Sequence, residues 1–196
     1  MFTLSYFRRM RLFVAVTPTA AAVAELAAAV RDVRRLPGAD RLRWADPASW
    51  HFTLAFLGET DEALLPGLGE RLGRAAHRHP AHELCLAGGG RFGDRVLWVG
   101  AGGDVETLQA LAASVVAGCR RAGAELDTTR AFHPHLTLAR ATGRVHLRPY
   151  AEALAGFHGV TWPADRLELV RSNLPASGMP GERPRYETVG SWELGR

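Results

Sequence analysis

The sequence contains the same four-residue pattern in two places. One copy begins at His51 and continues through Thr53 to a leucine; the other begins at His135 and continues through Thr137 to a leucine, 84 positions further on (135 − 51 = 84). Side chains alternate between the two faces of a β-strand, so each histidine would share a face with its threonine while the apolar residues anchor the strand in a core. If the two strands meet in the fold, two imidazoles and two hydroxyls converge on one site.

Such a set of groups is suited to phosphoryl transfer. Histidine has an ordinary pKa of about 6.5, so one imidazole can take a proton from an attacking water while the other, protonated, gives a proton to the departing oxygen. General acid–base catalysis contributes roughly 10²–10⁴-fold to a rate, and threonine hydroxyls can hydrogen-bond the phosphate oxygens where charge develops. A single His-x-Thr on a strand is usually a packing pair, but two copies that both end in leucine favour a functional site that needs no metal.

The composition limits which groups can hold phosphate. Of the 196 residues, 47% are hydrophobic and 22% are charged, as in an ordinary soluble globular protein. All 24 basic residues are arginine. The absence of lysine excludes a Schiff base on lysine, a P-loop and an enzyme that is adenylylated on lysine. A net charge of +4 is a weak bias towards polyanions such as RNA.

The N-terminus allows two interpretations. The basic residues at 8–11 and the apolar run after them resemble a signal peptide, but Pro18 interrupts that run and residues 11–16 make a good first strand. We interpret residues 1–9 as a leader or a misassigned start, with Met10 as the alternative start. No run reaches the roughly 18 apolar residues of a membrane span, and the two cysteines form neither a C-x-x-C pair nor a disulfide framework. A cytoplasmic protein is predicted.

The spacing of apolar residues, glycines and prolines predicts strands and helices along most of the chain. The expected strands cover about 11–17, 50–57, 83–93, 95–102, 134–140, 161–172 and 185–194. The expected helices cover about 19–35, 61–78, 104–122 and 149–157, and a loop covers 173–184. This order predicts an α+β fold of two similar lobes in a single domain over 10–196, with two antiparallel sheets facing a central cleft and helices outside.

Five longer stretches, in order and spanning nearly all of the chain from Met10 onward, carry a family likeness. They are RLFVAV at 11–16, WHFTLAFLGE at 50–59, FGDRVLWVG at 92–100, FHPHLTLAR at 132–140 and LVRSNLPASG at 169–178, followed by Tyr186. With them the chain resembles the 2H phosphoesterase superfamily, and within it the RNA 2′,3′-cyclic phosphodiesterase, or 2′-5′ RNA ligase, family. The paired His-x-Thr is specific for the superfamily, whereas the flanking FLG and PHLTLAR favour the family.

The resemblance implies a bilobal, pseudo-symmetric fold with a basic cleft and no cofactor. It implies an enzyme of RNA processing that opens 2′,3′-cyclic phosphates at RNA ends to 2′-phosphates, with ATP-independent 2′-5′ joining as the reverse reaction. In that reaction His51 is the proton donor, His135 is the proton acceptor, and Thr53, Thr137 and Arg140 bind the substrate. The expected partners are RNA ends with a 2′,3′-cyclic phosphate, tRNA fragments among them, without a metal or a membrane, and we expect a monomer.

Arg140 does not fit the simple alternation of a strand. It lies an odd number of residues after His135, so on a regular strand it would point to the opposite face. A β-bulge or the end of the strand would have to turn its side chain towards the site. Without such an irregularity, Arg140 is a solvated surface charge.

Other residues allow both a functional and a structural interpretation. The spacing of His77, His79 and His82 could suggest zinc, but Pro80 breaks any common face, and we interpret them as a solvated helix end. His133, beside the second motif, could either tune the site or line its rim.

Tryptophans and glycines raise two further alternatives. Trp44, Trp50 and Trp98 could stack on RNA bases or pack in the core. The glycines at 88–90 precede neither a helix nor a lysine, which favours a bulged strand end over a phosphate-binding loop.

Three functions remain open at this point. The first is hydrolysis of RNA 2′,3′-cyclic phosphate ends. The second is a related phosphodiesterase that acts on small cyclic nucleotides or 2′-5′ oligonucleotides, because the walls of the site and not the motif decide the substrate. The third is a non-catalytic RNA-binding module, which the intact histidines and threonines disfavour. Turnover of a cyclic mononucleotide compared with a longer RNA separates the first two.

Overall fold

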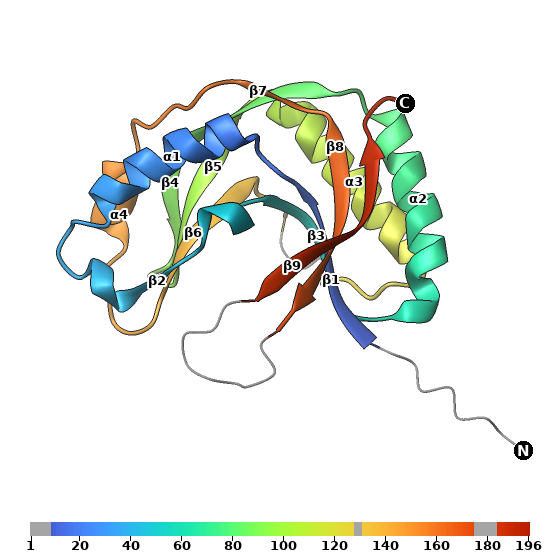
Figure 1. Cartoon of the computed structure of the whole chain (residues 1–196), viewed down its shortest axis with the longest axis horizontal. Helices are drawn as coiled ribbons and strands as arrows, with labels where there is room; N and C mark the ends of the chain where they lie inside the picture. The colour runs from blue at the N-terminus through green and yellow to red at the C-terminus, as the bar shows by residue number, and fades with distance from the viewer. Residues whose placement is uncertain (1–8, 128–130, 175–183) are drawn as a thin grey trace, which may run out of the picture.

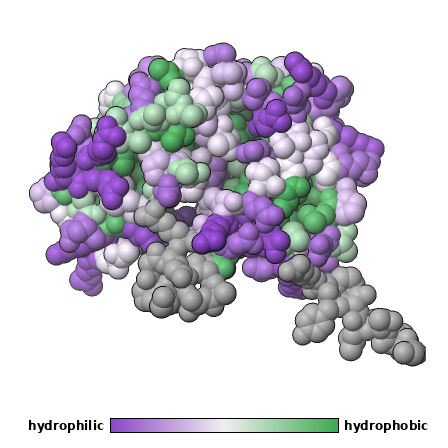
Figure 2. Space-filling model, in the orientation of Figure 1, coloured by the Kyte–Doolittle hydropathy of each residue, from purple (hydrophilic) through white to green (hydrophobic). Residues whose placement is uncertain are grey.

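The computed structural model describes residues 9–127, 131–174 and 184–196, so most of the loop predicted over 173–184 lies outside the described residues. Within these ranges the strands form two antiparallel sheets, and two helices cover the outer side of each sheet (Figure 1). The predicted α+β fold with two antiparallel sheets and outer helices is confirmed. We call the two halves lobe A and lobe B. The surface is hollowed between them, with hydrophilic residues at the edge of the hollow (Figure 2).

Lobe A contains a four-stranded sheet in the order β3-β1-β8-β9. Its strands are β3 (Phe52–Asp61), β1 (Arg9–Val16), β8 (Arg166–Asn173) and β9 (Arg185–Glu193). The helices α2 (Leu65–Arg78) and α3 (Val105–Arg121) cover it, and the short 3-10 helix η3 (Glu62–Leu64) leads from β3 to α2. The strand that follows His51 therefore pairs with β1, and β8 and β9 from the end of the chain complete the sheet on the other side of β1.

Lobe B contains a five-stranded sheet in the order β2-β6-β5-β4-β7. Its strands are β2 (Leu42–Trp44), β6 (His135–Ala141), β5 (Val96–Gly103), β4 (His82–Phe92) and β7 (Trp162–Ala164). The helices α1 (Ala20–Val33) and α4 (Arg148–Ala153) cover it. Two 3-10 helices, η1 (Ala39–Arg41) and η2 (Pro47–Ser49), flank β2. The strand that carries His135 lies next to the edge strand β2.

The ends of the helices follow the local sequence. The side chain of Thr19 accepts a hydrogen bond from the backbone N–H of Ala22 at the start of α1, and Asp104 accepts one from Thr107 at the start of α3. Gly123 follows α3 with φ +92°, a conformation that favours glycine. Pro66 lies in the first turn of α2, where its missing N–H costs no helical hydrogen bond, so α2 is not interrupted there. In the described ranges no helix combines the length and the apolar character needed to cross a membrane.

Several details differ from the sequence prediction. The strand expected to end at 57 continues to Asp61, and η3 then precedes α2. The strand β2 was not predicted, because at 3 residues it is too short to show an alternating pattern. The single strand expected over 161–172 is two strands, which lie in different sheets on either side of Asp165. The helix expected over 149–157 ends at Ala153.

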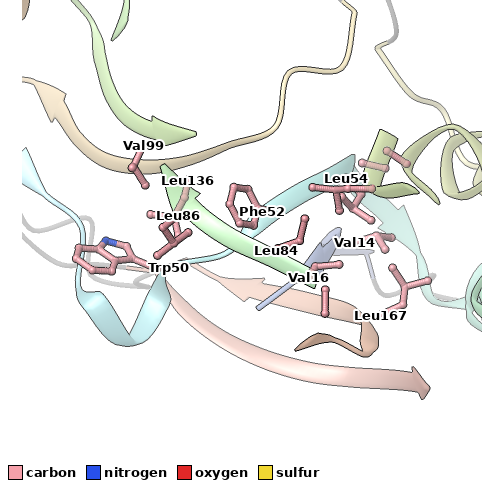
Figure 3. Packing of buried hydrophobic residues seen from close by; sticks show 14 of the residues in the cluster. Val14, Val16, Trp50, Phe52, Leu54, Leu84, Leu86, Val99, Leu136 and Leu167 are labelled. Atoms are coloured by element: carbon pink, nitrogen blue, oxygen red, sulfur yellow. The ribbon is translucent and has the colours of Figure 1, made fainter. Parts of the chain in front are cut away.

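The residues between histidine and threonine in the two motifs anchor both strands in one core. Phe52 and Leu136 are each 0% exposed and belong to the same cluster of buried side chains. Figure 3 shows them with Leu84 and Leu86 from β4, so side chains of both sheets contribute to this cluster. Burial of each such side chain contributes about 1.5–3 kcal/mol. This packing fixes the strands and sends their histidines and threonines to the opposite side.

Candidate active site

The first motif contains a β-bulge. The neighbouring strand β1 runs without interruption, and on it Ala15 pairs with Thr53 while Val14 pairs with Ala55. Leu54 is therefore an extra residue without a partner on β1. A bulge of this kind resets the alternation, so that residues beyond it change faces.

The second motif contains a bulge at the same position. On the neighbouring strand β5, Trp98 pairs with Thr137 while Leu97 pairs with Ala139. Leu138 is therefore the extra residue, and it corresponds to the leucine that is bulged in the first motif. The two halves of the site repeat a backbone irregularity as well as a sequence.

The bulge in β6 decides the direction of Arg140. After Leu138 the alternation restarts, so Arg140 lies on the same face of the sheet as His135 and Thr137. Phe56 has the corresponding place in β3, on the same face as Thr53. The irregularity that the sequence required for Arg140 is present. We call the faces of the two sheets that carry these side chains the site face.

Both imidazoles are held in the same way. Nδ1 of His51 lies 2.7 Å from the backbone oxygen of Ser49, and Nδ1 of His135 lies 2.8 Å from the backbone oxygen of His133. A carbonyl oxygen only accepts hydrogen bonds, so Nδ1 must carry a hydrogen in each ring. Nε2 is therefore the nitrogen that can gain or lose a proton in both histidines.

Aromatic rings enclose His51 in lobe A. Phe13 of β1 stacks on the imidazole with ring centroids 4.6 Å apart and an interplanar angle of 22°. Tyr186 of β9 meets the imidazole edge-on, with centroids 5.5 Å apart and an angle of 82°. These contacts fix the ring plane and exclude water from one of its faces.

The pKa of His51 reflects its burial and two charges of opposite sign. Burial lowers this pKa below the ordinary value, because a protonated imidazole is poorly solvated there. The hydrogen bond to the carbonyl of Ser49 and the negative charge of Glu168 raise it, and the charge of His135 lowers it. That last effect shows that the two imidazoles of the motifs lie within electrostatic reach of each other. Glu168 is in turn held by the hydroxyl of Thr17, which donates to Oε2 at 2.6 Å.

The surroundings of His135 in lobe B are aromatic and basic. Phe92 meets its ring edge-on at 4.8 Å and 86°, and Trp98 at 6.3 Å and 60°. Burial lowers the pKa of His135, the hydrogen bond to the carbonyl of His133 raises it, and the charges of His133 and Arg140 lower it further. His133 is exposed at the rim, and its charge also lowers the pKa of His135, so both interpretations of its role apply.

The remaining polar groups of the site face have no partners within the described part of the protein. Thr53 and Thr137 are half-buried, and neither hydroxyl hydrogen-bonds another described residue. Arg140 is exposed and forms no ion pair with a carboxylate of the described residues. These donors are free to bind an anion that enters between the lobes.

Sequence reasoning missed several residues of this face. Phe13 was only part of an expected apolar strand, and Glu168 was one position in the strand expected over 161–172. The signal for Glu168 was a carboxylate between two buried leucines, whereas Phe13 gave no separate signal, because all the residues from 12 to 16 are apolar and buried. Arg43 of β2, which lies opposite Arg140 in the register of β2 with β6, gave no signal, because β2 was not predicted.

The three histidines near the end of α2 do not converge. Nε2 of His79 lies 2.8 Å from Oγ of Ser114, whereas Nδ1 of His82 lies 3.1 Å from the backbone oxygen of Pro80. The interpretation as a solvated helix end is wrong for His82, which is buried on β4. Among the described residues, no group of three or more His, Cys, Asp or Glu side chains could hold a metal ion.

The tryptophans and glycines with two interpretations divide between core and site. Trp44 and Trp50 are buried in the core, whereas Trp98 lies beside the second histidine. The glycines at 88–90 form a bulge in the middle of β4, where Gly88 has φ +68°. A Cβ on Gly90 would lie 2.1 Å from the ring of Trp98, so this glycine makes room for the aromatic wall of the site.

A separate pocket of about 380 Å³ lies between α1 and α4. Its lining is mainly apolar and includes Val33, Leu36, Leu154 and Phe157. None of the predicted site residues contributes to it. The pocket is on the helix side of lobe B and is therefore distinct from the site face.

Comparison with known proteins supplies the family. A model of the 2′-5′ RNA ligase superfamily matches residues 12–175. An RNA 2′,3′-cyclic phosphodiesterase of Thermus thermophilus is 33% identical over 182 residues, which cover 86% of this chain and 85% of that protein. An RNA 2′,3′-cyclic phosphodiesterase of Geobacillus stearothermophilus is 30% identical over 156 residues; these are 77% of this chain and 47% of that protein, so the chain spans about half of its length.

A solved structure agrees with this assignment over almost the whole chain. A protein of Thermus thermophilus matches with a TM-score of 0.75 and 27% identity, covering 95% of this chain and 98% of that one. The likeness thus extends from the two motifs to the arrangement of both sheets. With RNA 2′,3′-cyclic phosphodiesterases as its relatives, this chain belongs to the 2′-5′ RNA ligase superfamily.

Proposed function

We propose that the protein hydrolyses 2′,3′-cyclic phosphates at RNA ends to 2′-phosphates. The observation that carries the proposal is the paired geometry of His51 and His135. Each imidazole is fixed through Nδ1 to a backbone carbonyl two residues earlier, which leaves Nε2 as the nitrogen that can exchange a proton. Two such nitrogens within electrostatic reach of each other can serve as the acid and the base of one displacement at phosphorus.

In the proposed reaction water attacks the phosphorus, and Nε2 of His135 takes its proton. The bond between phosphorus and the 3′ oxygen breaks as the new phosphorus–oxygen bond forms. Nε2 of His51 gives a proton to the departing 3′ oxygen, which leaves a 2′-phosphate and a 3′ hydroxyl. Proton exchange with solvent then returns the two imidazoles to their starting states.

The charges around the two rings support this division of roles. Burial lowers the pKa of His51, and the charge of Glu168 partly offsets this by favouring the protonated form that a donor needs. Arg140 and His133 favour the neutral form of His135, as an acceptor needs. The family resemblance gives the same assignment independently of the charges.

Stabilisation of the phosphate is assigned to three side chains. The hydroxyls of Thr53 and Thr137 can donate to the non-bridging oxygens, and the guanidinium of Arg140 can neutralise charge that develops there. All three lie on the site face without a described partner that would compete for them. A divalent metal is not needed for this chemistry.

Two further activities share the same groups. Joining of a 2′,3′-cyclic phosphate end to a 5′ hydroxyl is hydrolysis run with an alcohol in place of water, and it would use the same acid and base without ATP. Hydrolysis of a small cyclic nucleotide would use them as well, since both imidazoles act on the cyclic phosphate and not on the nucleobase.

The experiment that tests the proposal is identification of the product. The purified protein is incubated with an RNA oligonucleotide that ends in a 2′,3′-cyclic phosphate, and the product isomer is determined by phosphorus NMR or by chromatography against both standards. We expect the 2′-phosphate. A 3′-phosphate product would mean that the 2′ oxygen leaves, which contradicts the mechanism. RNA binding without turnover would identify a non-catalytic module.

A further inference from the structure

Arg43 lies opposite Arg140 at the edge of the sheet in lobe B. In the register of β2 with β6 the two arginines are direct partners. The neighbours of Arg43, Leu42 and Trp44, are buried in the core, so Arg43 points to the other side. Directly opposed residues of antiparallel strands share a face, with Cβ atoms about 4.5–5.5 Å apart. Arg43 therefore extends the site face beyond Arg140, away from His135.

This pair of cations is not balanced by the described part of the protein. Like charges directly opposite each other destabilise a sheet, and neither Arg43 nor Arg140 forms an ion pair within the described ranges. Three other strand arginines have carboxylate partners: Arg91 with Asp94 at 3.3 Å, Arg166 with Glu193 at 3.5 Å and Arg171 with Glu187 at 3.9 Å. Arg9 and Arg11 form no ion pair among the described residues, but in the register of β1 with β3 they lie opposite Asp61 and Glu59 and not opposite another cation. Arg43 and Arg140 differ from these in being two cations directly opposite each other, so an anion from outside the protein would relieve their repulsion.

Neighbouring groups at this end of the sheet are already engaged with one another. The N–H of Ala141 donates to the carbonyl of Arg95 at 3.0 Å, and the N–H of Thr142 donates to the carbonyl of Arg41 at 3.0 Å. The carboxylate of Asp94 is bonded to Arg91, His146 and the N–H of Leu147. The exposed guanidinium groups of the arginine pair therefore face solvent, where an anion can reach them.

We propose that Arg43 binds the phosphodiester on the 5′ side of the terminal nucleotide while Arg140 binds the reacting phosphate, so that the site selects single-stranded RNA over cyclic mononucleotides. The inference rests on the proposed function. A cyclic mononucleotide has only the reacting phosphate, whereas one more nucleotide supplies a second phosphate. Because β2 is the edge strand, the RNA chain can continue past Arg43 into solvent without meeting another strand of this sheet.

The test compares substrates that differ by one phosphodiester. We expect the wild-type protein to have a higher kcat/KM for a dinucleotide that ends in a 2′,3′-cyclic phosphate than for the matching cyclic mononucleotide. Arg43→Gln should lower kcat/KM about fivefold more for the dinucleotide than for the mononucleotide, as expected for loss of one exposed ion pair. Arg43→Lys keeps the charge and should retain most of the preference. Arg78→Gln, on the exposed side of α2, should leave both values unchanged.

A binding measurement separates this inference from the proposed function. The probe is a single-stranded RNA hexamer that ends in a 2′-phosphate, bound at several salt concentrations. Each phosphate that is neutralised on a single strand contributes about −0.7 to the slope of log K against log salt. Arg43→Gln should make that slope shallower by about 0.7, and Arg78→Gln should not change it.

The outcomes are distinguishable. Equal loss on both substrates, or no loss on either, would overturn the assignment of Arg43, as would an unchanged salt slope. Absence of turnover on either substrate by the wild-type protein would instead contradict the proposed function, and the salt slope would then decide the binding role of Arg43 alone.

Discussion

Lobe A holds His51 against Phe13 and places Glu168 near it, whereas lobe B holds His135 among aromatic edges and places Arg140 near it. The backbones of the two halves correspond: each has a histidine fixed to the carbonyl two residues earlier, a threonine on the same face and a bulge at the next leucine. The side chains around this repeated framework differ in charge.

The unequal charges allow a repeated framework to support the asymmetric reaction that we propose. A donor and an acceptor need different protonation states at the same pH, and identical surroundings would give both imidazoles the same proton affinity. The carboxylate in lobe A and the cations in lobe B break this equivalence. Arg140 in lobe B and Phe56 in lobe A occupy equivalent positions. The two lobes therefore differ in charge at this place although their backbones correspond.

The largest effect is expected from removal of either imidazole. His51→Ala and His135→Ala should each lower the rate of cyclic-phosphate opening by roughly 10²–10⁴-fold, because each removes one half of the acid–base pair. The double variant should be scarcely slower than the slower single variant, since the two groups act as a unit. Single-turnover kinetics measures all three.

A substrate with an acidic leaving group tests which half is the donor. Such a leaving group needs no proton, so it should restore the rate of His51→Ala far more than that of His135→Ala. Restoration of the other variant would mean that the roles of the lobes are reversed, and full activity in either alanine variant would end the two-histidine mechanism.

The next largest effect should come from the matching positions beyond the bulges. Arg140→Ala should lower kcat/KM about tenfold to a hundredfold through loss of a charged hydrogen bond, and this loss should shrink as salt is added. Phe56→Ala, which removes an exposed ring (62% exposed), should raise KM about fivefold, the low end of the effect of losing one stacked base, with little dependence on salt. Arg78→Ala serves as the control for a surface arginine. If the effects of Arg140→Ala and Phe56→Ala depended equally on salt, the proposed difference in charge between the two lobes would be contradicted.

A smaller effect is expected in the pH profile of kcat/KM. Glu168 raises the pKa of His51, so Glu168→Gln should lower that pKa; because the donor must be protonated, the alkaline limb should move to lower pH. Arg140 lowers the pKa of His135, so Arg140→Gln should raise it; because the acceptor must be neutral, the acid limb should move to higher pH. Both variants should narrow the bell, from opposite sides. Movement of the same limb in both would show that the charges do not distinguish the two histidines.

The smallest effect is expected from removal of metal ions. If the two lobes together supply the acid, the base and the phosphate-binding groups, exhaustive treatment with EDTA should leave the rate unchanged. The rate before and after treatment, and after separate addition of Mg²⁺, Mn²⁺ and Zn²⁺, checks this expectation. If EDTA abolished activity and one of these ions restored it, a metal ion and not the imidazole pair alone would be responsible for catalysis.

Features that depend on near neighbours along the chain could be predicted from the sequence alone. The two His-x-Thr-Leu segments, their alternation with buried Phe52 and Leu136, and the caps of α1 and α3 all follow from residues within a few positions. These features were enough to predict the α+β fold with outer helices and to place each histidine beside its threonine on one face. The two motif strands do not pair with each other, because β3 and β6 lie in different sheets.

Features that depend on partners far along the chain are set by the pairing of strands in the folded protein. The bulges at Leu54 and Leu138 exist only in the register with β1 and β5, and they set the directions of Phe56 and Arg140. Glu168 lies on the site face because β8 pairs with β1 across more than 150 residues of sequence (168 − 15 = 153). Arg43 gains its place from β2, a strand too short to form without β6. Strand pairing is a long-range interaction, so no local pattern could fix these four outcomes.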